Sequence, residues 1–211
     1  RGLEFDSEAY GVIDKVCKKL GIHWFASPWD LASVDFLENF DVVAHKVASA
    51  CMTDKSLLKR LNETGRPIFM STGMSTLDQI KAAVGLVDSN RLILMHTVSV
   101  YPAKPEQLNL GWISQLRQEF PGIPIGYSGH EVGVTPSVIA VAKYGATCVE
   151  RHVTLDRSMW GSDQSASLEP DGMRRVVQYI RSIPVVSGTG SKSVLEEEVP
   201  IAAKLRRVTD F

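Results

Sequence analysis

The feature that most constrains the fold of this chain is a structural unit that repeats along its 211 residues. Each unit has a short, almost continuously apolar strand, a polar turn and an amphipathic helix, a pattern typical of strands buried on both faces of a sheet. The predicted strands span residues 22–27, 42–48, 67–71, 92–97, 123–127 and 147–153. The predicted helices span residues 7–20, 31–39, 55–63, 76–87, 110–120, 134–144, 171–183 and 193–207. Their alternation predicts a parallel sheet with right-handed crossovers.

Capping residues support four of the predicted helix boundaries. Gly21 and Gly145 would end the first and sixth helices, because glycine readily takes the left-handed conformation found just past a helix. Asp30 and Ser75 would begin the second and fourth helices by accepting hydrogen bonds from free backbone N–H groups.

Two architectures fit this alternation: an open, doubly wound sheet, or a (β/α)₈ barrel of which two units are absent. An open sheet gathers its functional residues at one switch point, whereas a barrel carries them at the carboxyl ends of all its strands. Polar residues follow all six predicted strands here, in the runs SPWD (27–30), HKVAS (45–49), STGM (71–74), HTVSVYP (96–102), GYSGHE (126–131) and ERH (150–152). Neither GxGxxG nor GxxxxGK[ST] occurs, which disfavours a nucleotide site. We therefore predict the α/β class and an incomplete barrel.

Lys46 is the least expected residue of the predicted strand 42–48, which is otherwise apolar apart from His45. Burying an ammonium without a partner costs several kcal/mol, so Lys46 needs an anion. One candidate is a carboxylate of the protein itself. Another is a bound phosphate or carboxylate, which Ser49, three residues further on, would help to hold. The remaining alternative is that Lys46 lies at an exposed strand end and needs no anion. His45 points to the opposite side of the strand and is expected to face the helices.

His130 and His152 end two neighbouring predicted strands, 22 residues apart. Both imidazoles would then reach one point at the mouth of the barrel, and imidazole is a common ligand of transition metals. Glu150 lies on the same side of its strand as His152, where it would be a ligand, a base or a partner of a ligand. The alternative is a pair of structural histidines with hydrogen-bonded rings.

Hydroxyl groups and loop residues complete the candidate site. Ser71, Ser99 and Ser128 follow strands and could donate hydrogen bonds to phosphate oxygens, although a single serine is more often a turn or cap residue. Tyr101 and Asp163 lie in loops at the same rim, where aromatic rings beside polar groups suit a sugar; ordinary loop packing is the alternative.

Charge and cysteine content narrow the range of partners and compartments. A net charge of −1 gives no electrostatic footprint for nucleic acid or an anionic membrane, and no apolar run reaches the about 18 residues that a membrane span needs. The three cysteines match neither a disulfide framework nor a CxxC pair, so a reducing cytoplasm is the expected compartment.

Seven segments, in order and nearly end to end, resemble the sialic acid synthase family, which comprises phosphoenolpyruvate-dependent N-acetylneuraminate synthases and their legionaminate and pseudaminate relatives. The segments are ASPWD (26–30), KVAS (46–49), STGM (71–74), HTVSVYPAKPE (96–106), IPIGYSGHE (123–131), ERHVTLDR (150–157) and GSDQSASLEP (161–170). The resemblance implies a (β/α)₈ TIM barrel in which residues 1–211 supply strands three to eight. The first two βα units and the family's C-terminal antifreeze-like domain would then be absent, and a start at Arg1 suggests a fragment or a truncated product. A homodimer is implied for the full-length enzyme.

The resemblance also implies a reaction and residue roles. Phosphoenolpyruvate would condense with N-acetylmannosamine or a related N-acetylated amino sugar, giving N-acetylneuraminate or a related nonulosonic acid and phosphate. His130 and His152 resemble the ligands of a divalent metal (Mn²⁺ or Mg²⁺), and with Glu150 they form the implied catalytic set. The implied contacts to phosphoenolpyruvate are Lys46, Ser49, Ser71 and Ser128, and those near the amino sugar are Ser99, Tyr101 and Asp163.

The chain departs from the family pattern at three places, all of which concern the acceptor sugar. Ala48-Ser49-Ala50 stands where the family has GSG, Cys51 follows where an acidic residue is usual, and Gln164 replaces a frequent histidine. Two other readings stay open: a related barrel aldolase or deoxy-sugar-acid phosphate synthase, and a truncated barrel without catalytic activity.

Overall fold

The computed structural model describes residues 5–208, in two compact units that divide after Ile180. The larger unit carries the sheet, and the smaller one contains the helix α8 (Glu198–Leu205). None of the helices in residues 5–208 combines the length and the hydrophobicity that crossing a bilayer requires.

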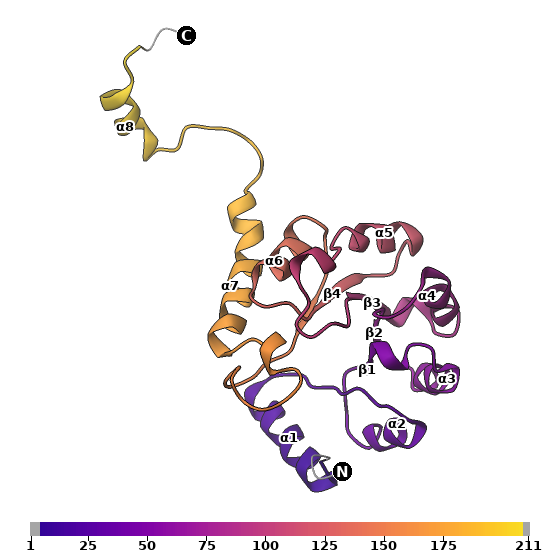
Figure 1. The fold of residues 1–211 in the computed structure, drawn as a ribbon. Coiled ribbons are helices and arrows are strands. Elements are labelled where there is room, and N and C mark those ends of the chain that lie inside the picture. The colour runs from indigo at the N-terminus through magenta and orange to yellow at the C-terminus, as the bar shows by residue number, and fades with distance from the viewer. Residues whose placement is uncertain (1–4, 209–211) are drawn as a thin grey trace. The chain divides into compact units, whose positions relative to one another are not determined.

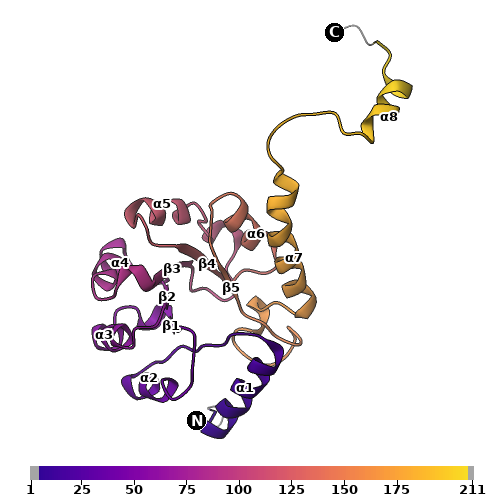
Figure 2. The same ribbon diagram turned by 180° about the vertical axis from the view of Figure 1, so that it is seen from behind.

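The core of the larger unit is a five-stranded sheet in which every neighbouring pair is parallel. Its strands, in sheet order, are β1 (His45–Val47), β2 (Ile68–Ser71), β3 (Leu92–Thr97), β4 (Ile125–Gly129) and β5 (Val149–Arg151). Sheet order equals chain order, so right-handed crossovers place every connecting helix on the same face. Figures 1 and 2 show these helices around the outside of the curled strands: α3 (Lys55–Glu63), α4 (Leu77–Val84), α5 (Trp112–Glu119) and α6 (Thr135–Ala142).

This arrangement decides between the two predicted architectures. A doubly wound sheet reverses its strand order and carries helices on both faces, whereas the sheet of this chain curls in one direction as half a barrel. The predicted α/β class is confirmed. The numbering of these strands as the fourth to eighth of a complete barrel stays a prediction.

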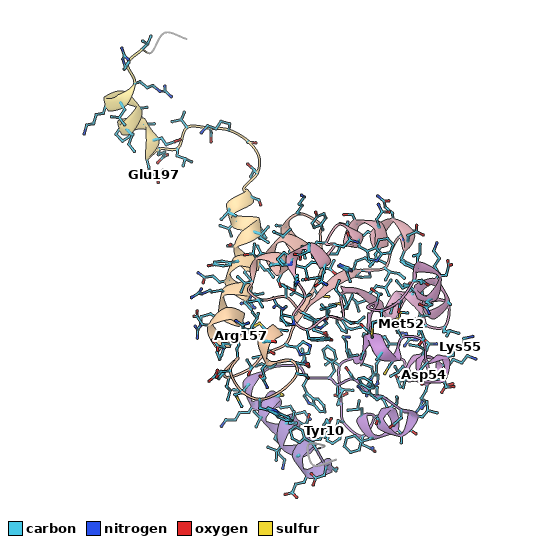
Figure 3. The ribbon with its side chains drawn as sticks, viewed as in Figure 1. Tyr10, Met52, Asp54, Lys55, Arg157 and Glu197 are labelled. Atoms are coloured by element: carbon cyan, nitrogen blue, oxygen red, sulfur yellow. The ribbon has the colours of Figure 1, made fainter. Side chains whose placement is uncertain are left out.

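The strand predicted at residues 22–27 is wrong as a strand. The segment is extended, but it joins the sheet through the bond from Lys46 N to Ala26 O (3.0 Å) and forms no ladder among the described residues. Side-chain packing holds it instead: Phe25 stacks on Phe69 with ring centroids 5.1 Å apart, and Trp24 packs at 5.8 Å against Tyr10 of α1. Tyr10 is labelled in Figure 3. Apolar composition therefore predicted the extended conformation but not the pairing.

The remaining elements lie close to their predicted positions. The helices α1 (Ser7–Leu20) and α3 and the strand β3 have the predicted bounds, whereas β4 begins later because Pro124 has no N–H to give to a ladder. The other elements are α2 (Leu31–Leu37), α7 (Pro170–Ser187) and the short 3₁₀ helices Ser49–Cys51, Ser89–Arg91, Pro105–Gln107 and Gln164–Ala166.

Three of the four predicted caps are confirmed and one is wrong. Gly21 and Gly145 have φ of 65° and 71°, and the Asp30 carboxylate accepts a hydrogen bond from Ser33 N. The cap of α4 is Thr76 rather than Ser75, because Thr76 and Gln79 exchange side-chain to backbone hydrogen bonds in a capping box.

Alternation along the strands separates an apolar layer from a polar one. Ile68, Met70, Leu94 and Tyr127 face the helices and are buried with Leu57, Leu58 and Leu61 of α3 and Ile113 and Leu116 of α5. The residues between them face the inside of the curled sheet. Burial of apolar side chains against the helices stabilises the sheet, so the inward-facing side chains are available to form a functional site.

Two histidines belong to the helix-facing layer. His45 is fully buried and its Nε2 lies 2.9 Å from Glu38 Oε1, which confirms that it faces away from Lys46. The His96 Nε2 donates to the Leu108 carbonyl at 2.8 Å.

We expect His96 to make the stability of the protein depend on pH. Burial lowers the pKa of His96 in the folded state, so the unfolded chain binds a proton more readily. The stability from the neutral ring is complete above the unfolded pKa, about 6.5, and is lost as the pH falls through the lower folded pKa. His96→Gln keeps a donor for Leu108, so its free energy of unfolding, measured by denaturant titration, should fall less between pH 7 and pH 5 than that of the wild type. Equal falls would contradict this role.

Candidate active site

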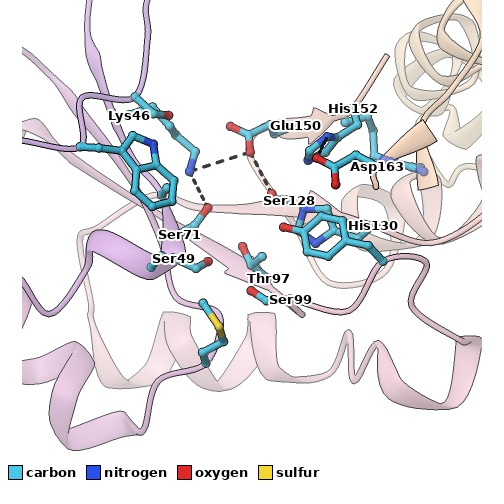
Figure 4. Close-up of a pocket in the computed structure, with 17 residues that line it drawn as sticks. Lys46, Ser49, Ser71, Thr97, Ser99, Ser128, His130, Glu150, His152 and Asp163 are labelled. Carbon is cyan, nitrogen blue, oxygen red and sulfur yellow. Dashed lines mark hydrogen bonds and ion pairs between the residues drawn. The ribbon is translucent and has the colours of Figure 1, made fainter. Parts of the chain in front are cut away.

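A cavity of about 560 Å³ lies at the carboxyl ends of the strands. Every residue predicted for the site lines it (Figure 4): Lys46, Ser49, Ser71, Ser99, Tyr101, Ser128, His130, Glu150, His152 and Asp163. The structure thus brings together residues spread over more than half of the sequence, while their individual roles stay predictions.

The inner polar layer results from the register of the strands. Thr97 lies opposite Ser128, and Ser128 lies opposite Glu150, so three polar side chains from β3, β4 and β5 form one row. Thr97 was not singled out from the sequence, although counting alternate residues along strand 92–97 would have found it. Trp29 and Met74 also line the cavity and were missed as site residues.

Lys46 holds its ammonium at the edge of this row. Its Nζ donates to Ser71 Oγ at 2.7 Å and to Val47 O at 3.0 Å, and it lies 3.9 Å from Glu150 Oε1 (Figure 4). Glu150 accepts instead a hydrogen bond from Ser128 Oγ at 2.9 Å. An ammonium has three donors, so two bonds leave one for a further acceptor.

The alternative in which a carboxylate of the protein is the anion that pairs with Lys46 is therefore correct only in part. The side chain of Lys46 is 9% exposed and that of Glu150 is 39% exposed, so the ion pair borders the cavity rather than the core. Burial lowers the pKa of Lys46, and the attraction of Glu150 opposes that fall. A bound anion would supply the remaining stabilisation of the charge.

A cradle of hydroxyls and backbone lies beside Lys46. Gly73 N donates to Ser49 Oγ at 3.1 Å, and Ser99 Oγ is buried and has no hydrogen-bond partner within the described residues. A Cβ at Gly73 would lie 2.3 Å from Ser99 Oγ and 2.7 Å from Ser49 Oγ, so only glycine allows this close approach. Hydroxyl donors around an ammonium suit the oxygens of a phosphate or a carboxylate.

The two predicted metal-binding histidines meet on the other side of the cavity. Their ring centroids are 5.1 Å apart, and the ring of Tyr101 lies 4.1 Å from that of His130. His130 Nδ1 lies 2.7 Å from the Val98 carbonyl, which can only accept, so Nδ1 carries the proton and Nε2 has a free lone pair. Burial lowers the pKa of His130, which favours the neutral imidazole that binds metals.

The donor set fits an open metal site rather than a closed one. His152 Nδ1 lies 3.5 Å from Asp163 Oδ2, and both side chains are partly exposed. Within residues 5–208, no three His, Cys, Asp or Glu side chains gather closely enough to hold an ion by themselves. Two imidazoles would leave coordination positions for water or a substrate oxygen.

Fold and site together define a barrel-type α/β protein in which a buried ammonium and several hydroxyls share one cavity with a pair of histidines. The model of the NeuB family matches residues 1–192, and the chain belongs to that family. The resemblance to sialic acid synthases is thereby confirmed.

Known relatives agree along almost the whole chain. Human N-acetylneuraminate-9-phosphate synthase is 38% identical over 207 residues, which are 97% of this chain and 57% of that protein. The N,N'-diacetyllegionaminic acid synthase of Legionella pneumophila is 34% identical over 98% of this chain and 60% of its own length. The crystal structure of the N-acetylneuraminic acid synthetase of Leptospira borgpetersenii, in complex with citrate, is 30% identical and superposes with a TM-score of 0.83 over 97% of this chain and 73% of that one. The chain thus spans less than two thirds of these two curated relatives.

Proposed function

We propose that this chain supplies the larger part of the barrel of an enzyme that condenses phosphoenolpyruvate with an N-acetylated amino sugar such as N-acetylmannosamine. The products would be a nonulosonic acid and inorganic phosphate. One observation carries the proposal: the buried ammonium of Lys46 and the Ser99 hydroxyl, which has no hydrogen-bond partner in residues 5–208, border the same cavity as the two histidines.

The anion-binding side of the cavity would hold phosphoenolpyruvate. Lys46 and the hydroxyls of Ser49, Ser71 and Ser128 would bind its phosphate and carboxylate and fix C3 toward the acceptor. Such fixation matters because an enol ether is a modest nucleophile.

The histidine side would receive the sugar aldehyde. A divalent cation, Mn²⁺ or Mg²⁺, held by His130 and His152 would supply Lewis-acid polarisation of the aldehyde oxygen. Tyr101 and Asp163 would orient the sugar from the rim. C3 of phosphoenolpyruvate then bonds to the aldehyde carbon, water adds at C2, and phosphate leaves as the C2–O bond breaks. Glu150, which lines the same cavity, would accept the proton of that water.

The acceptor sugar is the least defined part of the proposal. The two relatives above are named for different products, and Ala48, Cys51 and Gln164 depart from the family pattern near the acceptor. We further propose a cytoplasmic homodimer, as in the family.

A coupled assay tests the reaction. The product of the complete open reading frame that encodes this chain is supplied with phosphoenolpyruvate, a divalent metal and a panel of aldoses, and phosphate release is followed. We expect release with N-acetylmannosamine or another N-acetylated amino sugar, and none after chelation of the metal. A Lys46→Met variant controls for contaminating phosphatase.

Two results would overturn the proposal. Preference for an aldose phosphate without an N-acetyl group, such as arabinose 5-phosphate, would assign the protein to the deoxy-sugar-acid phosphate synthases. A well-folded protein that binds no phosphoenolpyruvate would support the non-catalytic alternative.

A further inference from the structure

A buried ion pair lies directly behind the two histidines, and no step of the proposed reaction uses it. Arg151 Nη1 donates to Glu131 Oε1 at 2.9 Å, and the two side chains are 1% and 2% exposed. Glu131 follows His130 in the chain, and Arg151 precedes His152. Alternation turns both charged side chains toward the helices while the histidines face the cavity.

The ion pair is the centre of a larger hydrogen-bond network. Arg151 Nη1 also lies 2.8 Å from Gly133 O and 3.0 Å from Ser137 Oγ of α6, so its two hydrogens are shared among three acceptors, and Nη2 donates to the backbone oxygen of Glu131 at 2.5 Å. The Tyr127 hydroxyl of β4 donates to Glu131 Oε2 at 2.7 Å. The network therefore ties β4, β5 and α6 to the residues that flank the histidines.

The sheet itself does not join the two histidines. The β4–β5 ladder ends at the pair Gly129–Arg151, one residue before each histidine. The backbone oxygen of His130 accepts from Ala103 N at 3.0 Å, and that of His152 accepts from Leu168 N at 2.8 Å. The Arg151–Glu131 pair thus bridges the two strand ends at the level where the ladder stops.

This ion pair affects the histidines by fixing the positions of the two strand ends more than by its electric field. They are opposite and 2.9 Å apart, so their fields largely cancel at the cavity. A buried ion pair is weak evidence for stability, since well-packed apolar residues of similar volume often serve the fold as well. Gly129 is fitted to the pair: a Cβ there would lie 2.5 Å from Glu131 Oε2 and 3.1 Å from Arg151 Cδ.

We propose that Arg151 and Glu131 are positioning residues that set the separation of the His130 and His152 imidazoles, and thereby the affinity of the site for a divalent cation. The inference rests on the proposed function, because it takes the two histidines as metal ligands. Arg151 is among the residues that line the cavity, but its side chain and that of Glu131 are 1% and 2% exposed, so the inference assigns to a buried ion pair a property that a merely structural pair would not have.

The test measures Mn²⁺ affinity in the absence of substrates, by calorimetry or by the electron paramagnetic resonance signal of the free ion. The variants are Glu131→Gln and Arg151→Met, examined at a temperature where each is folded by circular dichroism. The matched control is Arg66→Met, which removes an ion pair with Glu38 (2.8 Å, side chains 25% and 26% exposed) outside the cavity. We expect a loss of Mn²⁺ affinity of about tenfold in the first two variants, the low end of the effect of groups that orient metal ligands, because this pair acts on the rings through the backbone; the control should keep wild-type affinity.

The outcomes separate this inference from the proposed function. Wild-type Mn²⁺ affinity in folded Glu131→Gln and Arg151→Met overturns the positioning role and leaves the metal site intact. If Arg151→Met does not fold, Glu131→Gln decides, because it keeps the shape of the side chain. Mn²⁺ binding that is absent from the wild type, or that survives His130→Ala, overturns the metal site and this inference with it.

Discussion

Replacement of either His130 or His152 by alanine is expected to reduce metal-dependent phosphate release by about a thousandfold or more. The two rings are 5.1 Å apart and no third His, Cys, Asp or Glu among the described residues completes the set, so loss of one ring would leave the proposed metal site with a single protein ligand. Polarisation of a carbonyl by a bound metal is worth several kcal/mol of transition-state stabilisation, and each 1.4 kcal/mol is about a factor of ten in rate.

The measurement is kcat/KM for both substrates as a function of Mn²⁺ concentration. His96→Gln is the matched control, because His96 is also a buried strand histidine but contacts Leu108 outside the cavity. It should keep the wild-type rate and metal dependence. A metal-dependent rate near that of the wild type in either alanine variant would remove that histidine from the metal site.

The convergence of the site could be predicted because parallel strands bring their carboxyl ends to one edge. Period-two alternation alone assigned Lys46 to the inside of the sheet and His45 to the helices, and the structure confirms both. It also placed Glu150 on the side of His152, where it lines the same cavity.

The features that could not be predicted from the sequence depend on the register of the strands and on which residues become neighbours in the fold. Residues 22–27 have the composition of a strand, but a ladder requires a series of backbone hydrogen bonds to a neighbouring strand, and the described residues give this segment the single bond from Lys46 N to Ala26 O. Arg151 and Glu131 are 20 residues apart, and their pairing follows only once the β4–β5 register sets Gly129 opposite Arg151. Ser75 and Thr76 are chemically equivalent caps, so a one-residue difference in the start of α4 decided between them.

Substitution of Lys46 by methionine is expected to weaken phosphoenolpyruvate binding by about a hundredfold while leaving the folded protein at least as stable. A buried hydrogen bond to a charged group contributes about 1.5–3 kcal/mol, and Lys46 offers both a charge and a free donor to the bound anion. The stability expectation has the opposite sign, because burial already disfavours the ammonium, as its lowered pKa shows. Methionine removes that cost and keeps most of the volume, and the Glu150 left behind is 39% exposed and can be hydrated.

The two measurements together separate an anion-binding lysine from a structural one. Phosphoenolpyruvate affinity can be followed by calorimetry or by tryptophan fluorescence, to which Trp29 in the lining of the cavity contributes, and stability by denaturant titration. Glu63→Gln, which alters an exposed ion pair with Arg60 on α3, is a control expected to change neither quantity appreciably. If Lys46 served only to neutralise Glu150, Lys46→Met would lower the free energy of unfolding and leave phosphoenolpyruvate affinity unchanged. That pattern would show that the Lys46 ammonium does not bind the anion, because an ammonium that binds phosphoenolpyruvate must contribute to its affinity.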